Sequence, residues 1–113
     1  MTNMQDKTSF IVWVYLTLAI LTEVAGTTAM KLSAGFTALK PSIAIFFFYA
    51  LSFIFLTFSL KRLEIGFAYA IWAGLGTLLI FFIGVGFFHE SLNLLKIISL
   101  LCIIVGVVGL KQA

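Results

Sequence analysis

The sequence has little charge and few of the residues on which soluble catalytic and metal-binding domains depend. Of its 113 residues only 10% are charged, and it contains one cysteine, one histidine and one proline. A soluble domain of this length would carry about 25% charged residues, so this chain could not cover a water-facing surface. The single Cys102 excludes an intrachain disulfide and a thiolate metal cage, and the lone His89 beside one glutamate makes no metal site.

Basic residues are in slight excess, but they do not form the stripe that a nucleic-acid-binding surface needs. The net charge is +3, and the seven lysines and arginines are scattered at the ends of apolar runs, where they can reach lipid headgroups. No nucleotide-binding motif is present, because Gly74 and Gly76 lack a third glycine at the required spacing and no Gly-Lys-Ser/Thr sequence occurs. We therefore expect no nucleic-acid partner, no bound cofactor and no direct use of ATP.

What the sequence does have is apolar residues in long runs. It is 63% hydrophobic, with a mean hydropathy of +1.23. At roughly 20 residues for each crossing of a hydrocarbon core about 30 Å thick, four spans take up about 80 residues and leave only turns and tails. We predict an all-α integral membrane protein with a single multi-pass domain over 1–113, no enzymatic activity, and helices at about 10–30, 42–60, 65–88 and 92–110. The first run is too long for a signal peptide, so we expect it to be retained as a helix.

The lysine and arginine bias that sets membrane orientation is nearly absent. With four spans, both termini and the second loop share one face, which carries Lys7, Lys61, Arg62 and Lys111. The opposite face carries Lys31, Lys40 and Lys96. A count of four against three is too small a difference for the positive-inside rule to predict an orientation. Either the topology is weakly specified, or the chain inserts both ways and copies of opposite orientation pair as an antiparallel homodimer with dual topology.

Glu23 is the one acidic residue deep in an apolar span. It lies about 4–5 Å past the bilayer centre at about 1.5 Å per residue, where insertion costs a few kcal/mol and acidic residues are functional by default. No basic residue lies deep in any span to neutralise it. A carboxyl that is neutral in a dry site and ionises when a cation or water arrives suits the exchange of a proton for a cation. The structural alternative is a protonated Glu23 that hydrogen bonds between helices. Glu64 and Glu90 fall in loops, where we expect hydrated turn residues.

Aromatic residues are spaced to form a wall around Glu23. They recur at helical intervals on the first three spans, and the expected wall consists of Trp13, Tyr49, Phe53, Tyr69 and Trp72. Aromatic faces attract poorly hydrated cations such as quaternary ammonium groups. Taken singly, most aromatic residues here would face lipid, and Trp13 suits an interfacial belt. Their coincidence with Glu23 predicts a site for lipophilic cations.

Small residues mark two further places. Gly74 and Gly76 in the third span allow close helix packing, and they also predict a flexible point or kink. In the fourth span Ser99 and Gly106 lie seven residues apart on one face, which resembles a small-residue dimerisation stripe.

Two stretches of the sequence carry a family resemblance that extends over nearly the whole chain, about residues 13–111. Residues 22–31 (TEVAGTTAMK), followed by Ser33, Gly35, Phe36, Pro41 and Ser42, are similar to the first half of the small multidrug resistance transporters. Residues 66–76 (GFAYAIWAGLG) resemble the signature of their third helix.

The resemblance implies an antiparallel homodimer in the inner (cytoplasmic) membrane that exchanges protons for cations, driven by the proton gradient and surrounded by lipid. Glu23 of both protomers would bind protons or cation in competition, and Tyr49, Tyr69 and Trp72 would line the pocket. Gly26 and the two threonines after it resemble the branch that exports aromatic and quaternary cations. The alternatives are a guanidinium or polyamine exporter, one subunit of a heterodimer, or a partner subunit that transports nothing.

Three positions depart from the pattern of that branch. Ala73 stands where a serine is frequent, so one pocket hydroxyl is missing. Trp13 stands where a tyrosine is frequent, which changes the hydrogen bonding of the aromatic wall. Residues 61–64 replace a loop that usually contains proline. We expect the substrate range to differ accordingly.

Overall fold

The fold is a set of four membrane-length helices. The computed structural model describes residues 4–113, with side chains from residue 10 onward, so the side chain of Lys7 lies outside the described part. The helices are α1 (Met4–Leu32), α2 (Leu39–Ser59), α3 (Ile65–Phe87) and α4 (Leu94–Gln112). Each contains a stretch long and apolar enough to cross a membrane, and no strand occurs between residues 4 and 113. The predicted all-α membrane fold is confirmed.

The helix boundaries differ from the predicted ones by a few residues, for local reasons. α2 begins at Leu39, so Pro41 is its third residue rather than its start. Proline is tolerated there because the first turn has no intrahelical partner for its missing N–H. α4 begins at Leu94 because Asn93 caps it, with its side-chain oxygen accepting the Lys96 N–H at 2.9 Å.

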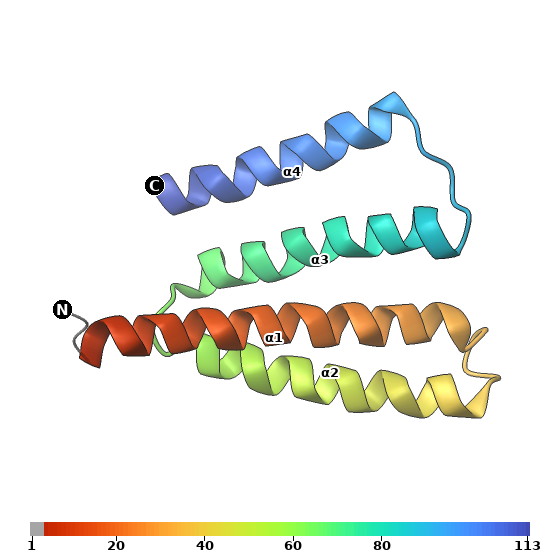
Figure 1. Ribbon diagram of the computed structural model, residues 1–113, viewed down its shortest axis with the longest axis horizontal. Helices are drawn as coiled ribbons and strands as arrows, with labels where there is room; N and C mark the ends of the chain where they lie inside the picture. The colour runs from red at the N-terminus through yellow and green to blue at the C-terminus, as the bar shows by residue number, and fades with distance from the viewer. Residues whose placement is uncertain (1–3) are drawn as a thin grey trace.

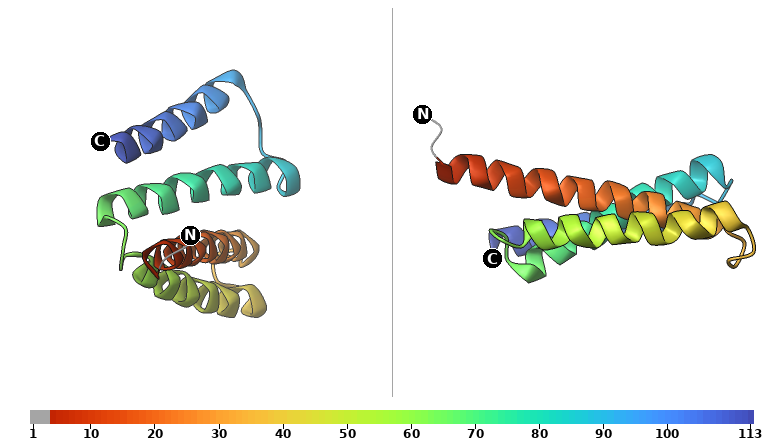
Figure 2. Two further views of the ribbon diagram at one scale, coloured as in Figure 1. Left: turned by 60° about the vertical axis from the view of Figure 1, so that its left-hand side comes forward. Right: turned by 90° about the horizontal axis from the view of Figure 1, so that it is seen from below.

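The four helices run in alternating directions, as the short loops require. Across the view of Figure 1 the order is α4, α3, α1, α2, and the start of α1 lies at the same end as the end of α4. α1 packs closely along α2, α3 packs against α1, and α4 packs against α3 (Figure 2). The core is formed by Leu16, Ile20 and Val24 of α1 with Ile71 of α3. The residues next to these in the sequence, Glu23 on α1 and Trp72 on α3, therefore lie at a similar depth in the helix bundle.

α4 stands largely apart from the other helices. None of its residues is buried, and most of its large apolar side chains are exposed. Ser99 and Gly106 are both exposed on it, and nothing lies within 4 Å of where a Cβ would stand at Gly106. This surface is open to lipid or to another chain, and the dimer interface at Ser99 and Gly106 stays a prediction.

Candidate cation-binding site

The Glu23 carboxyl is half-buried on α1 and belongs to a chain of hydrogen bonds. Thr27, one turn further along α1, donates from Oγ1 to Glu23 Oε1 at 2.8 Å. The same Thr27 hydroxyl hydrogen bonds the Tyr49 hydroxyl of α2. A hydroxyl carries one proton, so while Thr27 donates to Glu23 it accepts from Tyr49. The chain Tyr49–Thr27–Glu23 thus links α2 to the carboxyl.

The backbone of α3 approaches the other side of the carboxyl at Gly76. A Cβ atom at this position would lie only 2.6 Å from Glu23 Oε2, so the close approach requires glycine. Gly74 has different neighbours, because a Cβ there would meet the methyl groups of Ile103 and Val107 of α4 at 3.2 and 3.1 Å. α3 is helical through both glycines. Gly76 therefore adjoins the site, Gly74 serves the packing of α4, and the predicted kink stays a prediction.

Four of the predicted aromatic residues form one continuous line of rings. The ring centroids of Tyr49 and Phe53 on α2 are 5.9 Å apart, and Phe53 lies 6.2 Å from Trp72 on α3. Trp72 in turn lies 5.4 Å from Tyr69. Trp72 is half-buried, whereas Phe53 and Tyr69 are exposed over 53% and 58% of their surface. The line therefore begins at the hydrogen-bonded Tyr49 and ends on the outer surface of the chain.

The orientation of Trp72 depends on Ser52, which the sequence did not single out. Ser52 is fully buried, accepts a hydrogen bond from Trp72 Nε1 at 3.1 Å and donates to the Ala19 carbonyl of α1 at 2.7 Å. It therefore joins α1, α2 and α3 at one point. Its signal in the sequence was its position three residues after Tyr49, which places both on one face of α2.

These elements enclose a cavity of about 290 Å³ beside Glu23. It is lined by Glu23, Thr27, Trp72, Ala73, Gly76, Thr77 and Ile80. Ala73 offers no hydroxyl, as expected, but Thr77 lies one turn further on and was missed; its Oγ1 donates to the Ala73 carbonyl at 2.7 Å. None of the lining residues is basic, so Glu23 is the only charge on the wall.

Of the predicted binding residues, only Glu23 and Trp72 line this cavity. Tyr49, Phe53 and Tyr69 are connected to it through the line of rings, and Gly26 and Trp13 lie elsewhere. Gly26 is buried beneath Tyr49, and a Cβ there would stand 2.6 Å from the tyrosine ring, so Gly26 allows Tyr49 to lie close to α1. Trp13 packs edge-on against Phe67, at 6.1 Å between centroids, and lines a separate cavity between α3 and α4. Within a single chain Trp13 does not reach Glu23, and its predicted role stays a prediction.

Four membrane-length helices define a multi-pass membrane protein, and α1 and α3 together place a carboxyl, two threonine hydroxyls and the Trp72 ring around one cavity. The family comparison agrees with this class. The model of the Small Multidrug Resistance protein family matches residues 11–103, and the chain belongs to that family. The resemblance inferred from the two sequence stretches is confirmed.

Several curated relatives cover most of the chain. The chain is 53% identical to "Uncharacterized membrane protein YvaE" of Bacillus subtilis (strain 168), over 88% of this chain and 83% of that protein. It is 42% identical to "Multidrug resistance protein EbrB" of the same organism, over 88% of this chain and 85% of that protein. The identity is also 42% to "Quaternary ammonium compound-resistance protein QacG" of Staphylococcus sp. (strain ST94), over 88% and 92% of the two chains.

Proposed function

We propose that the protein is a proton-coupled antiporter that exports hydrophobic and quaternary organic cations, with Glu23 holding either a proton or the cation. The observation that carries this proposal is the Glu23 carboxyl itself. It lies in a membrane-spanning helix, lines a cavity whose wall has no basic side chain, and accepts a hydrogen bond from Thr27. Its hydrogen bond to Thr27 lies within α1, so this bond does not itself join two helices as a purely structural carboxyl would.

The coupling follows from competition for one carboxylate. An organic cation stabilises the ionised form of Glu23 through its charge and through the face of Trp72. A proton removes the negative charge, so it weakens cation binding and favours release. The names of the relatives EbrB and QacG, for multidrug and quaternary ammonium resistance, support organic cations as the substrates.

A second copy of the chain completes the proposed transporter. The cavity of one chain is at the small end of the range for ligand sites, about 300–1,000 Å³, and its aromatic line ends on the exposed rings of Phe53 and Tyr69. α4 also presents a long exposed apolar surface. An antiparallel partner would cover both, and its own Glu23 would titrate together with the first as a coupled pair. The balanced lysine and arginine count supports the opposite orientations.

Uptake into proteoliposomes tests the proposal. We expect tetraphenylphosphonium to accumulate when the lumen is more acidic than the medium, with the membrane potential held at zero by valinomycin and equal potassium. Accumulation then reports exchange against protons rather than a response to voltage. Uptake that ignores the pH gradient would contradict antiport. Binding of guanidinium but not of tetraphenylphosphonium would contradict the proposed substrate class.

Trp72→Ala is expected to weaken tetraphenylphosphonium binding by about tenfold to thirtyfold. A desolvated cation gains about 2 kcal/mol from the face of a tryptophan, and the alanine removes that face. Trp72→Phe should fall between the two, because it keeps a smaller ring. Isothermal titration of purified protein measures the effect. Phe87→Ala is the control, since it removes an exposed ring from the same helix outside the cavity. Equal losses in the two alanine variants would remove Trp72 from the site.

A further inference from the structure

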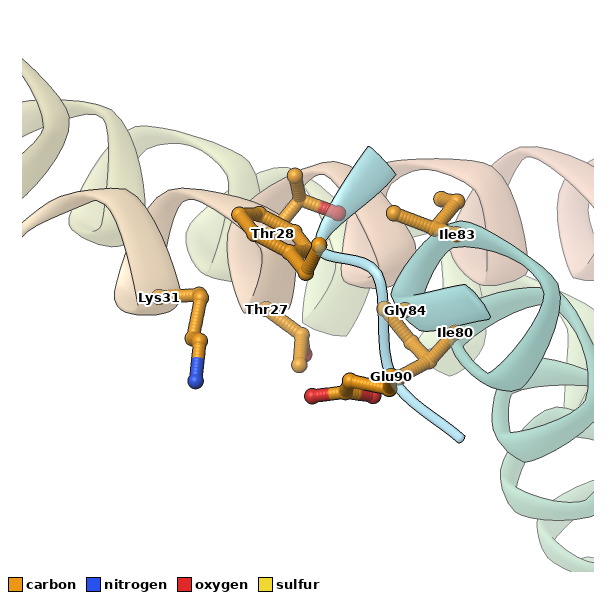
Figure 3. A pocket seen from close by; sticks show the side chains of 8 residues that line it. Thr27, Thr28, Lys31, Ile80, Ile83, Gly84 and Glu90 are labelled. Atoms are coloured by element: carbon orange, nitrogen blue, oxygen red, sulfur yellow. The ribbon is translucent and has the colours of Figure 1, made fainter. Parts of the chain in front are cut away.

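A second cavity adjoins the Glu23 site on the side of the third loop. It has a volume of about 170 Å³, and Thr27 and Ile80 line both cavities. Figure 3 shows its other walls, where Lys31 extends from α1 and Glu90 from the loop after α3. The two cavities therefore lie next to each other, with Glu90 lining the one and Glu23 the other.

The third loop holds Glu90 in a defined place. The backbone N–H groups of Phe88 and Glu90 both donate to the Gly84 carbonyl, at 3.1 and 3.0 Å. His89, between them, has a φ of 57°, in the left-handed region that commonly ends helices. The chain thus turns back on the last turn of α3. Glu90 is exposed, as expected for a turn residue, and its backbone is held at the end of α3.

The carboxyl of Glu90 lies across Gly84 and points toward Thr27 (Figure 3). It takes the space that a Cβ would need at Gly84, and the three atoms nearest to that position all belong to the Glu90 side chain. Gly84 is therefore what allows the carboxyl to face the cavity. The position of the Glu90 carboxyl thus depends on Gly84, six residues earlier, as well as on Glu90 itself.

Lys31 is the other charged side chain on this cavity. Its Nζ lies 6.0 Å from the centroid of the Phe88 ring, so an alkylammonium group already lies near an aromatic face here. Lys31 is exposed near the end of α1, where a long side chain can extend to the lipid headgroups. When Lys31 extends to the headgroups, Glu90 and the Phe88 ring become available to a cation from solution.

We propose that this cavity is a transient second site, in which Glu90 binds the ammonium head group of a cation on its way between water and Glu23. This inference rests on the proposed function, because it supplies the route to the site where exchange occurs. A cavity of about 170 Å³ is too small for a drug-sized ligand but has room for a head group. A negative charge at the entrance attracts cations and acts mainly on the rate of binding.

Binding kinetics test the inference. Stopped-flow tryptophan fluorescence follows phenyltrimethylammonium binding, with Trp72 in the Glu23 cavity as the reporter. Glu90→Gln is expected to slow association by about threefold to tenfold and dissociation by the same factor, so that Kd changes less than about twofold. Both rates fall because the cation enters and leaves through the same site. Glu64→Gln, which neutralises the loop carboxyl before α3, is the matched control and should bind at the wild-type rate.

Gly84→Ala provides a second variant that keeps the charge. The atoms nearest to its methyl group belong to the Glu90 side chain, whose end is movable, so the fold should persist while the carboxyl leaves the cavity. We expect the same slowing as in Glu90→Gln. The double variant should be no slower than either single one, because both changes remove one interaction.

Three results would overturn the inference: association at the wild-type rate in both variants, a change in dissociation alone, or additive effects in the double variant. Each would mean that Glu90 does not lie on the path. Failure of the proposed function has a different signature. In that case Glu23→Gln would bind phenyltrimethylammonium as the wild type does, whatever the Glu90 variants do.

Discussion

Glu23→Gln is expected to abolish proton-driven cation uptake and to leave the fold intact. Glutamine has nearly the same size and keeps an oxygen that accepts the Thr27 hydrogen bond seen at 2.8 Å. It can neither carry the negative charge that binds the cation nor exchange a proton. Removing one partner of a desolvated charge pair costs about 3–5 kcal/mol, so affinity should fall at least about 100-fold. Uptake of tetraphenylphosphonium into proteoliposomes under a pH gradient measures the loss.

The control for this experiment is Glu64→Gln, which changes the same chemical group in the exposed loop before α3. It should retain uptake. The melting temperature of Glu23→Gln should stay close to that of the wild type, because glutamine keeps the size of glutamate and the bond to Thr27. If Glu23→Gln retained coupling, the carboxyl would be structural and the proposed mechanism wrong.

Gly76→Ala is expected to weaken cation binding about tenfold or more. The added methyl group would lie 2.6 Å from Glu23 Oε2, so the carboxyl must move away from α3 and strain or break its bond to Thr27. A charge-assisted hydrogen bond of this kind is worth about 1.5–3 kcal/mol. Titration of purified protein with tetraphenylphosphonium measures the effect.

Gly74→Ala is the matched control, because it makes the same change two residues away on the same helix. Its methyl group would press on Ile103 and Val107 of α4 rather than on the site. We expect binding within about twofold of the wild type and an effect on stability instead, since small overpacking costs about 1–3 kcal/mol. If both variants instead slowed the exchange of conformations equally while binding stayed intact, helix flexibility at the two glycines would be the better account.

The sequence predicted the fold and singled out Glu23 because both inferences follow from the membrane itself. Apolar runs of membrane length have one stable form in lipid, and a single acidic residue among them has a cost that only function explains. Helical spacing also predicted that Tyr49, Phe53, Tyr69 and Trp72 share a region, because residues one turn apart lie on one face.

Which other side chains adjoin Glu23 could not be predicted, because this depends on which sides of the helices pack against one another. Ser52 and Thr77 looked like other hydroxyls in apolar helices, most of which bond their own backbone, as Thr22 and Thr28 do here. Nor did the sequence tell Gly76 from Gly74, although only one of them adjoins the site. Trp13 shares a helix face with Glu23 but lies ten residues away, about 15 Å along the axis, and a helical wheel ignores that distance.

Glu90 is the exposed loop residue that the sequence predicted, but its place beside a cavity could not be predicted. A glutamate in a short polar loop is usually hydrated, and nothing in the loop sequence suggests otherwise. Its placement depends on the left-handed backbone of His89 and on the missing Cβ of Gly84, six residues earlier. Such a combination becomes visible only when the end of α3 is seen in three dimensions.

The most direct test of the central claim is the release of protons when a cation binds. Tetraphenylphosphonium is added to purified protein in weak buffer at a series of starting pH values, and the change in pH is recorded. If one carboxyl holds either a proton or the cation, wild-type protein releases protons in step with binding, and Glu23→Gln releases none. Cation binding without proton release at any pH, or the same release from Glu23→Gln, would contradict the account.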